Sequence, residues 1–600
     1  MLKRTHMCGE LRIDHDGQTV TLAGWVNTYR DQGKGLIFID LRDREGLMQV
    51  VFDLEDVGEH VVTEARSLRR EDVIAITGLV RKRVGDPNPR LATGEVEVMA
   101  TKLEVLNKTE TPPILPDEHD AQKIAEEKRL QYRYIDLRRP RMQHILRRRF
   151  EVTRITRQFF ADHGFIEIET PCLIKTTPEG ARDFIVPSRA YPGQWYALPQ
   201  SPQIFKQILM ASGFDRYLQI VRCFRDEDPR ADRQAEFSQI DLEMSFVDRD
   251  DIITLMSEFT RHLWMKMLDI DIGDIPVMSH QEAMDRFGID RPDTRFDLEL
   301  TDVSDLAAKT EFRVFQDALA KDKGVVKAIR VPGGAAKMSR KITDGYSEFV
   351  KTFGAGGVPT VKFTENGYET GVAKFVAPIA DELKQRLGLE VGDLVFFGAD
   401  TNTVVCRALG ELRNKLARDL ELIDPTAWNF LWVVDFPMFE YDAEQGRWVA
   451  LHHPFTGPMP GEEDKLDDDP GGCISAAYDL VCNGSEIAGG SIRIHQPPMQ
   501  QKVFRLLGIN DEEAEQKFGF LLRALRYGAP PMGGIAFGLD RLVMLLVGTN
   551  NIRDVIAFPK TQTGQDLMTE APGPVDPQQL EELHVRIELP NDTPAPAGAG

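Results

Sequence analysis

Residues 222–246 constrain the fold of this chain most strongly, because they place many paired charges between two apolar segments. Residues 218–223 predict a buried strand, and the alternation of apolar and polar residues over 237–246 predicts a second strand. The charged residues between them, with Pro229, predict the loop of a long hairpin. Arginine's planar fork suits a phosphate, and a nearby carboxylate can hold a base amine or a metal ion. The alternative is a solvated hairpin tip with surface ion pairs.

The hairpin carries the sequence FRDE over residues 224–227, and Phe237 stands at the start of its second strand. This pattern resembles motif 2 of class II aminoacyl-tRNA synthetases. The resemblance implies that Arg225 binds the α-phosphate of ATP, that Glu227 binds the adenine amine and that Phe237 stacks on adenine. Two further loop residues join the expected ATP site, Asp226 and Gln234.

Length and composition describe an ordinary globular protein. The 600 residues suggest about three or four domains, and no run of about 18 apolar residues and no signal peptide is present, so we expect a cytoplasmic protein. The six cysteines are scattered without a CxxC pair, which argues against a zinc site or a disulfide framework. The net charge of −22 argues against indiscriminate nucleic-acid binding but leaves room for a local basic footprint.

The first 107 residues carry short strand signals. The expected strands cover residues 18–27, 36–41, 47–52, 73–81 and 94–106, and a helix is expected over 57–68. Such strands with one helix predict a Greek-key barrel of the oligonucleotide-binding (OB) fold, whose exposed face can offer aromatic side chains to unstacked bases.

Residues 24–52 resemble the anticodon-binding barrel of the aspartyl, asparaginyl and lysyl synthetases. The resemblance implies that Phe38 stacks on an anticodon base, with Arg30 and Gln49 reading base edges. Gln32 joins this expected site, in a loop (RDQGKG) one residue longer than is usual in the family. Taken alone, Phe38 is as well explained as a core aromatic.

Residues 108–140 predict a linker or hinge, polar and proline-rich at its start. The most basic segment of the chain, residues 128–157, holds eleven Lys or Arg against Asp136 and Glu151. Its apolar residues recur at helical spacing, which predicts an amphipathic helix with a cationic face. In so acidic a chain we expect this face to contact phosphates; the alternative is a solvated surface.

Residues 164–189 resemble motif 1, which builds the dimer interface of class II synthetases, so the resemblance implies a homodimer. The segment KTTPEGA within it resembles the loop that closes on the amino acid and places Glu179 near the substrate's α-ammonium. A helix over 197–210 puts Gln203 and Lys206 on one face, and its apolar neighbours indicate that Lys206 borders a pocket.

The remaining segments complete the expected architecture of a multidomain α+β protein. A class II catalytic domain with an antiparallel sheet is expected over 141–290 and 416–575. An inserted α+β module of unassigned chemistry is expected over 291–415, and a tail over 576–600. The KMSR tetrapeptide in the insertion imitates a class I synthetase signature and is interpreted as a coincidence.

The carboxyl-terminal part carries further candidate site residues. Neighbouring carboxylates, Asp479 and Glu486, suit a Mg²⁺ ion that bridges ATP phosphates. Residues 538–541 (Gly538, Leu539, Asp540 and Arg541) resemble motif 3, so Arg541 is expected to hold the γ-phosphate. By the same resemblance, Arg225 and Arg541 are the catalytic pair that stabilises charge on the transferring phosphate.

The three motifs in order, with the barrel and the insertion, most resemble bacterial-type aspartyl-tRNA synthetases. The resemblance implies that L-aspartate is activated with ATP and passed to tRNA-Asp; charging of tRNA-Asn stays open. The implied aspartate site comprises Glu179, Gln203, Lys206, Arg225, Asp241, His452, His453 and Arg493. In it, Lys206 and Arg493 would take the substrate's side-chain carboxylate, with Asp241 at the opposite, ammonium end. Met532 departs from the family, which commonly has histidine there.

Two alternatives remain from sequence alone. One is a catalytically degenerate synthetase paralogue that only binds tRNA, against which the intact candidate residues argue. The other is an amino-acid ligase such as asparagine synthetase A, which shares the catalytic fold but lacks the barrel.

Overall fold

The computed structural model describes residues 2–117, 123–177, 180–227 and 233–589. It divides into two compact units, Met1–Arg147 with Ile556–Gly573, and Arg148–Val555 with Pro574–Gly600. Within the described ranges, no helix is long and apolar enough to cross a membrane.

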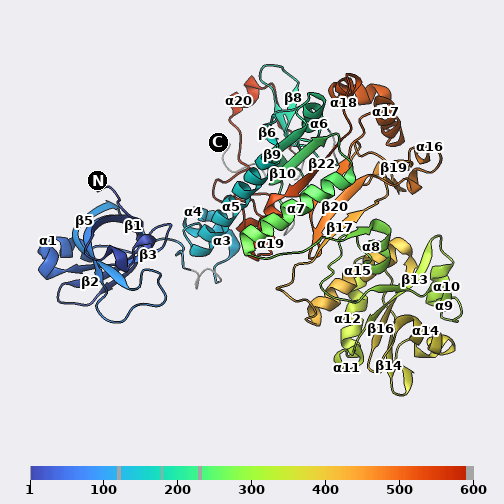
Figure 1. The fold of residues 1–600 in the computed structure, drawn as a ribbon, viewed down its shortest axis with the longest axis horizontal. Helices are drawn as coiled ribbons and strands as arrows, with labels where there is room; N and C mark the ends of the chain where they lie inside the picture. Colours follow the sequence, from blue (N-terminus) through green and yellow to red (C-terminus); the bar gives the residue numbers. More distant parts are fainter. Residues whose placement is uncertain (1, 118–122, 178–179, 228–232, 590–600) are drawn as a thin grey trace. The chain divides into compact units, whose positions relative to one another are not determined.

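The first unit contains a closed β-barrel (Figure 1), with strands in the order β1-β2-β3-β5-β4. Its elements are β1 (Thr19–Asp31), β2 (Leu36–Arg42), β3 (Leu47–Asp53), α1 (Leu54–Arg66), β4 (Val73–Lys82) and β5 (Val96–Asn107). Alternate residues of each strand fill the interior, as Ile37, Ile39 and Leu41 show by being fully buried. The predicted OB barrel is confirmed.

The basic segment forms short helices and one long one: α3 (Glu126–Gln131), α4 (Arg133–Asp136) and α5 (Pro140–Asp162). Three of its arginines form ion pairs with buried acids. Asp136, which is 1 % exposed, forms ion pairs with Arg133 at 2.6 Å and with Arg139 at 2.9 Å. Arg138 pairs with Glu71 at 2.9 Å. These three guanidinium groups thus pair with acids of the protein, whereas the side chain of Arg154 is 59 % exposed. The expected contact of this face with phosphates stays a prediction.

The second unit is built on a large, mostly antiparallel sheet in the order β11-β17-β20-β21-β22-β10-β9-β6. Its strands are β6 (Ile166–Glu167), β9 (Arg216–Phe224), β10 (Glu236–Ser245), β11 (Val277–Ser279), β17 (Phe430–Val434), β20 (Ala477–Cys482), β21 (Ser485–Ile492) and β22 (Met532–Gly538). The two strands predicted around the charged loop are β9 and β10, which pair antiparallel with Glu236 opposite Phe224.

The two faces of this sheet have different side chains, and the difference places the site. The rings of Phe537 on β22 and Phe259 on α7 (Arg249–Leu268) meet edge to face at 5.4 Å, so this face packs on helices. Asp241 and Glu243 alternate with the apolar residues of β10 and lie opposite Ala536 and Gly534 of β22. The second face therefore carries buried acids beside small residues, which leaves room for a ligand.

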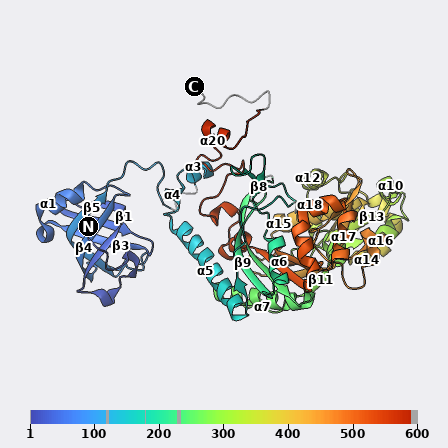
Figure 2. The ribbon, with the colours of Figure 1, turned by 90° about the horizontal axis from the view of Figure 1, so that it is seen from above.

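Further elements surround the sheet. They are β7 (Ile185–Pro187), β8 (Trp195–Ala197), α6 (Gln203–Ala211), α8 (His280–Phe287), β18 (Phe439–Asp442), β19 (Arg447–Ala450), α16 (Lys465–Asp468), α17 (Pro497–Leu506), α18 (Asp511–Arg526), α19 (Leu539–Val547) and α20 (Pro577–Glu582). Helices α17 and α18 lie side by side (Figure 2), and α6 packs against both α18 and β10.

A separate sheet forms between residues 300 and 401, in the order β12-β13-β16-β14-β15. Its elements are β12 (Leu300–Asp302), α9 (Ser304–Ala307), α10 (Arg313–Leu319), β13 (Gly324–Val331), α11 (Gly334–Lys337), α12 (Arg340–Lys351), β14 (Thr360–Thr364), β15 (Gly367–Glu369), α13 (Ala373–Val376), α14 (Ala380–Leu387), β16 (Leu394–Thr401) and α15 (Asn402–Asp419). Met338 of the KMSR tetrapeptide is 2 % exposed and packs in this module's own core, as expected of a coincidental match.

Candidate functional site

A first cavity, of about 240 Å³, opens where the β9–β10 hairpin meets β21, β22 and the start of α19. Residues predicted for ATP line it: Arg225, Glu227, Gln234, Phe237, Glu486, Gly538, Asp540 and Arg541. The Arg225 guanidinium lies 5.1 Å from the centre of the Phe237 ring, and the Arg225 backbone N–H donates to the Ala235 carbonyl at 2.9 Å. The neck of the hairpin thus holds the cation and the aromatic ring together.

Two residues predicted for this site have other surroundings. Leu539 is 1 % exposed and does not line the cavity, because the first turn of α19 turns its side chain into the core. The Asp226 carboxylate pairs with Arg182 at 2.6 Å and also lies outside the cavity lining. The side chain of Leu539 is buried, whereas that of Asp226 is 37 % exposed, and its role at the nucleotide stays a prediction.

A second cavity, of about 480 Å³, adjoins the first and shares Arg225, Glu227 and Glu486 with it. Its lining includes most residues predicted for the amino acid: Gln203, Lys206, Arg225, Asp241, His452, His453 and Arg493. The amide nitrogen of Gln203 is buried, and no hydrogen-bond partner for it exists among the described residues. A buried donor without a partner is costly, so this one is suited to a ligand.

Four buried charges lie together at the floor of the second cavity. The Lys206 ammonium is 3.0 Å from Asp241 and 3.3 Å from Glu243, and Arg493 donates through Nε to Glu243 at 3.0 Å. All four side chains are at most 3 % exposed. Two cations are therefore balanced by two carboxylates, which is what allows them to be buried.

This cluster corrects one expectation. Asp241 was expected opposite Lys206, at the ammonium end of the substrate, but it is the ion-pair partner of Lys206. Strand β10 places Asp241 and Glu243 on the same face, next to α6, so both acids face the cations. Burial raises the pKa of Asp241 to about 6, although the charge of Lys206 opposes the shift.

Two histidines extend the cluster. His453 Nε2 lies 2.6 Å from an Nη1 of Arg493, and burial together with that positive charge holds the pKa of His453 well below its usual range. The ring is therefore neutral, and Nε2 can accept from Arg493. His452 Nε2 lies 3.8 Å from Asp479; burial opposes its protonation, but Asp479 raises the pKa of His452 overall.

Asp479 and Glu486 converge over Gly489. A Cβ at Gly489 would lie 2.7 Å from an Asp479 oxygen and 3.4 Å from a Glu486 oxygen, so only glycine fits between them. The charge of Asp479, helped by burial, raises the pKa of Glu486. Two carboxylates held this close suit a Mg²⁺ ion, which takes its other ligands from water and phosphate. In the same way, a Cβ at Gly534 would lie 1.8 Å from a Glu243 oxygen.

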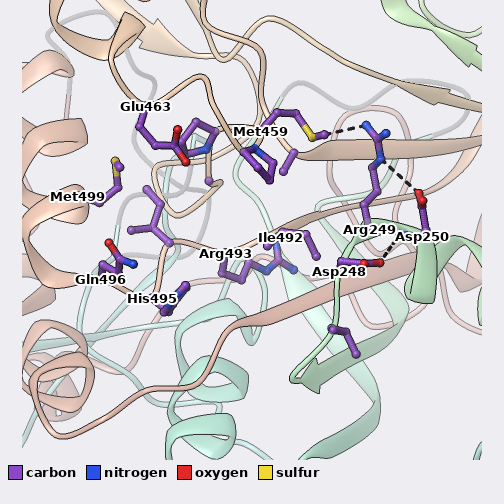
Figure 3. Close-up of a pocket in the computed structure, with 16 residues that line it drawn as sticks. Asp248, Arg249, Asp250, Met459, Glu463, Ile492, Arg493, His495, Gln496 and Met499 are labelled. Atoms are coloured by element: carbon purple, nitrogen blue, oxygen red, sulfur yellow. Dashed lines mark hydrogen bonds and ion pairs between the residues drawn. The ribbon is translucent and has the colours of Figure 1, made fainter.

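A third cavity, of about 460 Å³, is lined by Arg249, Met459, Glu463, His495 and Met499 among others (Figure 3). Arg493 also lines it, so this arginine stands between the third cavity and the second. Arg249 there is paired with Asp435 at 2.7 Å.

In the first unit, three of the predicted anticodon residues, Arg30, Phe38 and Gln49, lie on the neighbouring strands β1, β2 and β3, and Gln49 among them is only 4 % exposed. Phe38 on β2 is half-buried between the fully buried Ile37 and Ile39, so it points away from the core. The Arg30 guanidinium lies 6.0 Å from the Phe38 ring and donates to Gln49 at 3.3 Å. Gln32 is exposed in the β1–β2 loop. The alternative of a core aromatic is therefore wrong for Phe38.

Comparisons with known proteins agree with this geometry. Residues 125–562 match the family model "tRNA synthetases class II (D, K and N)", and residues 20–106 match "OB-fold nucleic acid binding domain". The chain belongs to the class II tRNA synthetases of the D, K and N group. The predicted fold class, an OB barrel followed by a class II catalytic domain, is thereby confirmed.

The similarity to curated relatives extends over nearly the full length of this chain and of each relative. The chain is 52 % identical over 592 residues to the aspartate–tRNA(Asp/Asn) ligase of Caldanaerobacter subterraneus subsp. tengcongensis, covering 98 % of this chain and 99 % of the relative. It is also 52 % identical over 590 residues to the ligase of the same name from Halothermothrix orenii, covering 98 % and 99 %. Among solved structures, asparaginyl-tRNA synthetase from Pyrococcus horikoshii complexed with asparaginyl-adenylate matches with a TM-score of 0.59 at 20 % identity, over 94 % of this chain and 99 % of that chain, which shows a common fold.

Three further positions bear on the predicted site. Glu179 lies outside the described residues. Met532 is fully buried in an apolar cluster with Met210 and Tyr217 and lines neither the first nor the second cavity. Sequence reasoning missed Glu243, although its position two residues after Asp241 in an alternating strand was a usable signal.

Proposed function

We propose that the protein is an aspartate–tRNA ligase. It activates L-aspartate with ATP to aspartyl-adenylate and pyrophosphate, then passes the aspartyl group to the 3′ end of tRNA. The observation that carries the proposal is the pair of adjoining cavities that share Arg225, one with the motif 2 and motif 3 residues and one floored by the buried charge cluster. Relatives at 52 % identity named aspartate–tRNA(Asp/Asn) ligase support the same activity.

The first cavity is proposed as the ATP site. Phe237 would stack on adenine, Glu227 would accept from its amine, and Arg225 and Arg541 would hold the phosphates. The α-carboxylate of aspartate then attacks the α-phosphorus as the bond to pyrophosphate breaks. No general base is needed, because the attacking carboxylate is already ionised, so catalysis is positioning and charge stabilisation. When bound at Asp479 and Glu486, Mg²⁺ would supply further neutralisation of phosphate charge.

The second cavity is proposed as the aspartate site. Arg493 and Lys206 are fixed by Glu243 and Asp241, so their remaining N–H groups are aimed before the substrate arrives. A side-chain carboxylate accepts from both, whereas the amide of asparagine would turn donors toward donors. Gln203, with its free buried donor, adds a further contact. Glu179 is kept as the proposed partner of the substrate's ammonium.

The barrel face is proposed as the anticodon site, with Phe38 stacking and Arg30, Gln32 and Gln49 at base edges. Because the relatives are named for both tRNA-Asp and tRNA-Asn, we propose that both are charged. The domain boundaries given from sequence and a cytoplasmic location, where tRNA is charged, remain part of the proposal. So does a homodimer, supported by Ile166 and Leu173 of the motif 1 segment, which are 49 % and 52 % exposed.

Charging assays test the proposal. Purified protein with ATP, Mg²⁺ and labelled aspartate should aminoacylate tRNA-Asp and tRNA-Asn transcripts at comparable rates. Charging of tRNA-Asp alone would limit the activity to one tRNA. A protein that binds both tRNAs but makes no aspartyl-tRNA would instead be a degenerate paralogue, and the proposal would be wrong.

A further inference from the structure

A buried ion pair joins the long helix α5 to the motif 3 segment. Arg149 of α5 donates from Nη1 to one carboxylate oxygen of Asp540 at 2.5 Å, and the same nitrogen lies 3.3 Å from the Val555 carbonyl. The other Asp540 oxygen accepts from the backbone N–H of Ser238 at 2.8 Å. The side chains of Arg149 and Asp540 are 19 % and 4 % exposed.

Asp540 therefore connects three segments through one carboxylate. Asp540 is the second residue of α19, and the next residue, Arg541, lines the ATP cavity. Ser238, which Asp540 anchors, follows Phe237, the ring expected to stack on adenine. That carboxylate therefore links the phosphate-binding arginine to the adenine-binding ring, in addition to the pairing of β10 with β22.

Arg149 supplies the cation that pairs with this buried carboxylate. Without that cation the buried carboxylate has no partner for its charge and turns toward water. The bond to Ser238 then weakens, and the two halves of the ATP cavity lose one of their links, beside the pairing of β10 with β22. The residues of the aspartate cavity do not include Arg149, Ser238 or Asp540.

We propose that Arg149 is a positioning residue for ATP, acting through Asp540 on Phe237 and Arg541. The inference rests on the proposed function only in assigning the first cavity to ATP. Arg149 touches no substrate; its effect is on the geometry of groups that do. It follows that removing Arg149 weakens ATP and leaves aspartate affinity unchanged.

The experiment compares Arg149→Gln with the wild type in aspartate-dependent ATP–pyrophosphate exchange. We expect the KM for ATP to rise at least about 10-fold, which corresponds to about 1.4 kcal/mol, with the KM for aspartate within about twofold. Arg149→Lys, which keeps the charge, should restore the KM for ATP to within about threefold. The matched control is Arg154→Gln on the same helix, because Arg154 pairs with Glu151 at the surface, with side chains 59 % and 37 % exposed.

A double variant separates positioning from general stability. Arg149→Gln with Asp540→Asn removes both charges, so its KM for ATP should lie below that of Arg149→Gln alone. An Arg149→Gln enzyme with a lower melting temperature but an unchanged KM for ATP would show a purely structural role and overturn the inference. Equal rises in both KM values would overturn it too.

Titration of the protein with ATP in a calorimeter measures ATP binding without the reaction. It therefore tests the role of Arg149 independently of the proposed function. If the wild type binds ATP but catalyses no aspartate-dependent exchange, the proposed function fails while weaker ATP binding by Arg149→Gln still supports the role of Arg149. If both proteins bind ATP equally, the inference about Arg149 fails whatever reaction the wild type catalyses.

Discussion

Replacing Arg493 with leucine should abolish aspartate activation while leaving ATP binding intact. Arg493 is 3 % exposed and makes a two-point contact with Glu243, at 3.0 Å and 3.2 Å. The native cluster holds two cations and two carboxylates, and the substrate's side chain adds a third carboxylate. Without Arg493 that carboxylate would enter a site with a net negative charge.

The size of the effect follows from Coulomb's law. One unit charge about 5 Å away, at an effective dielectric constant of about 20, contributes about 3 kcal/mol, or about 100-fold. The lost charge-assisted hydrogen bond adds to this. We therefore expect kcat/KM for aspartate to fall by at least about 10²-fold. The KM for ATP should stay within about twofold, because Arg493 does not line the ATP cavity.

The assay is pyrophosphate exchange with each substrate varied in turn. Because Arg493→Leu leaves Glu243 with one cation fewer, a double variant with Glu243→Gln restores the charge balance and protects the fold. That double variant should remain folded and still fail to activate aspartate. The control is Arg222→Leu, whose partner Glu236 lies at the surface with a side chain 37 % exposed. Normal aspartate kinetics in a folded Arg493→Leu protein would refute the reasoning.

Three further perturbations test other parts of the site. Arg225→Ala should lower pyrophosphate exchange by at least about 10²-fold, the loss of one transition-state donor, and activity within threefold of wild type would contradict this. Phe38→Ala should raise the KM for tRNA by the worth of one stack, about 1–3 kcal/mol, and leave tRNA-independent exchange unchanged; an equal fall in both would make Phe38 a folding residue. Because the pKa of His453 is lowered in the folded protein, below about pH 6.5 this side chain is protonated in the unfolded chain but stays neutral in the folded protein. Wild-type stability should therefore fall, relative to His453→Gln, by up to about 1.4 kcal/mol per pH unit as the pH drops below 6.5 in urea titrations, and parallel curves would contradict it.

Much of the fold could be predicted from local sequence patterns. The alternation of apolar and polar residues over 218–246 predicted β9 and β10, because a strand's two faces alternate between consecutive residues. The barrel strands were predictable for the same reason. The outward position of Phe38 was left open by the sequence, since only the closure of the barrel decides which face of β2 is inside.

The charge cluster shows what sequence reasoning could not reach. Lys206 lies on α6, Glu243 lies on β10 and Arg493 follows the last residue of β21, and no spacing rule links them. The sequence assigned Lys206 and Arg493 to the substrate's carboxylate, whereas in the structure Asp241 and Glu243 already balance both charges. Similarly, the sequence did not show that Arg133 and Arg139 pair with Asp136, or that Arg138 pairs with Glu71, because these partners are set by the folded structure.

The central claim is that the second cavity selects a carboxylate side chain. The most direct measurement is pyrophosphate exchange by the wild-type protein with aspartate and with asparagine under the same conditions. Asparagine has the same shape but would present an amide donor to Arg493 and Lys206, leaving buried donors without acceptors. We predict a preference for aspartate of at least about 10³-fold in kcat/KM, or about 4 kcal/mol. Turnover of asparagine within tenfold of aspartate would contradict the account.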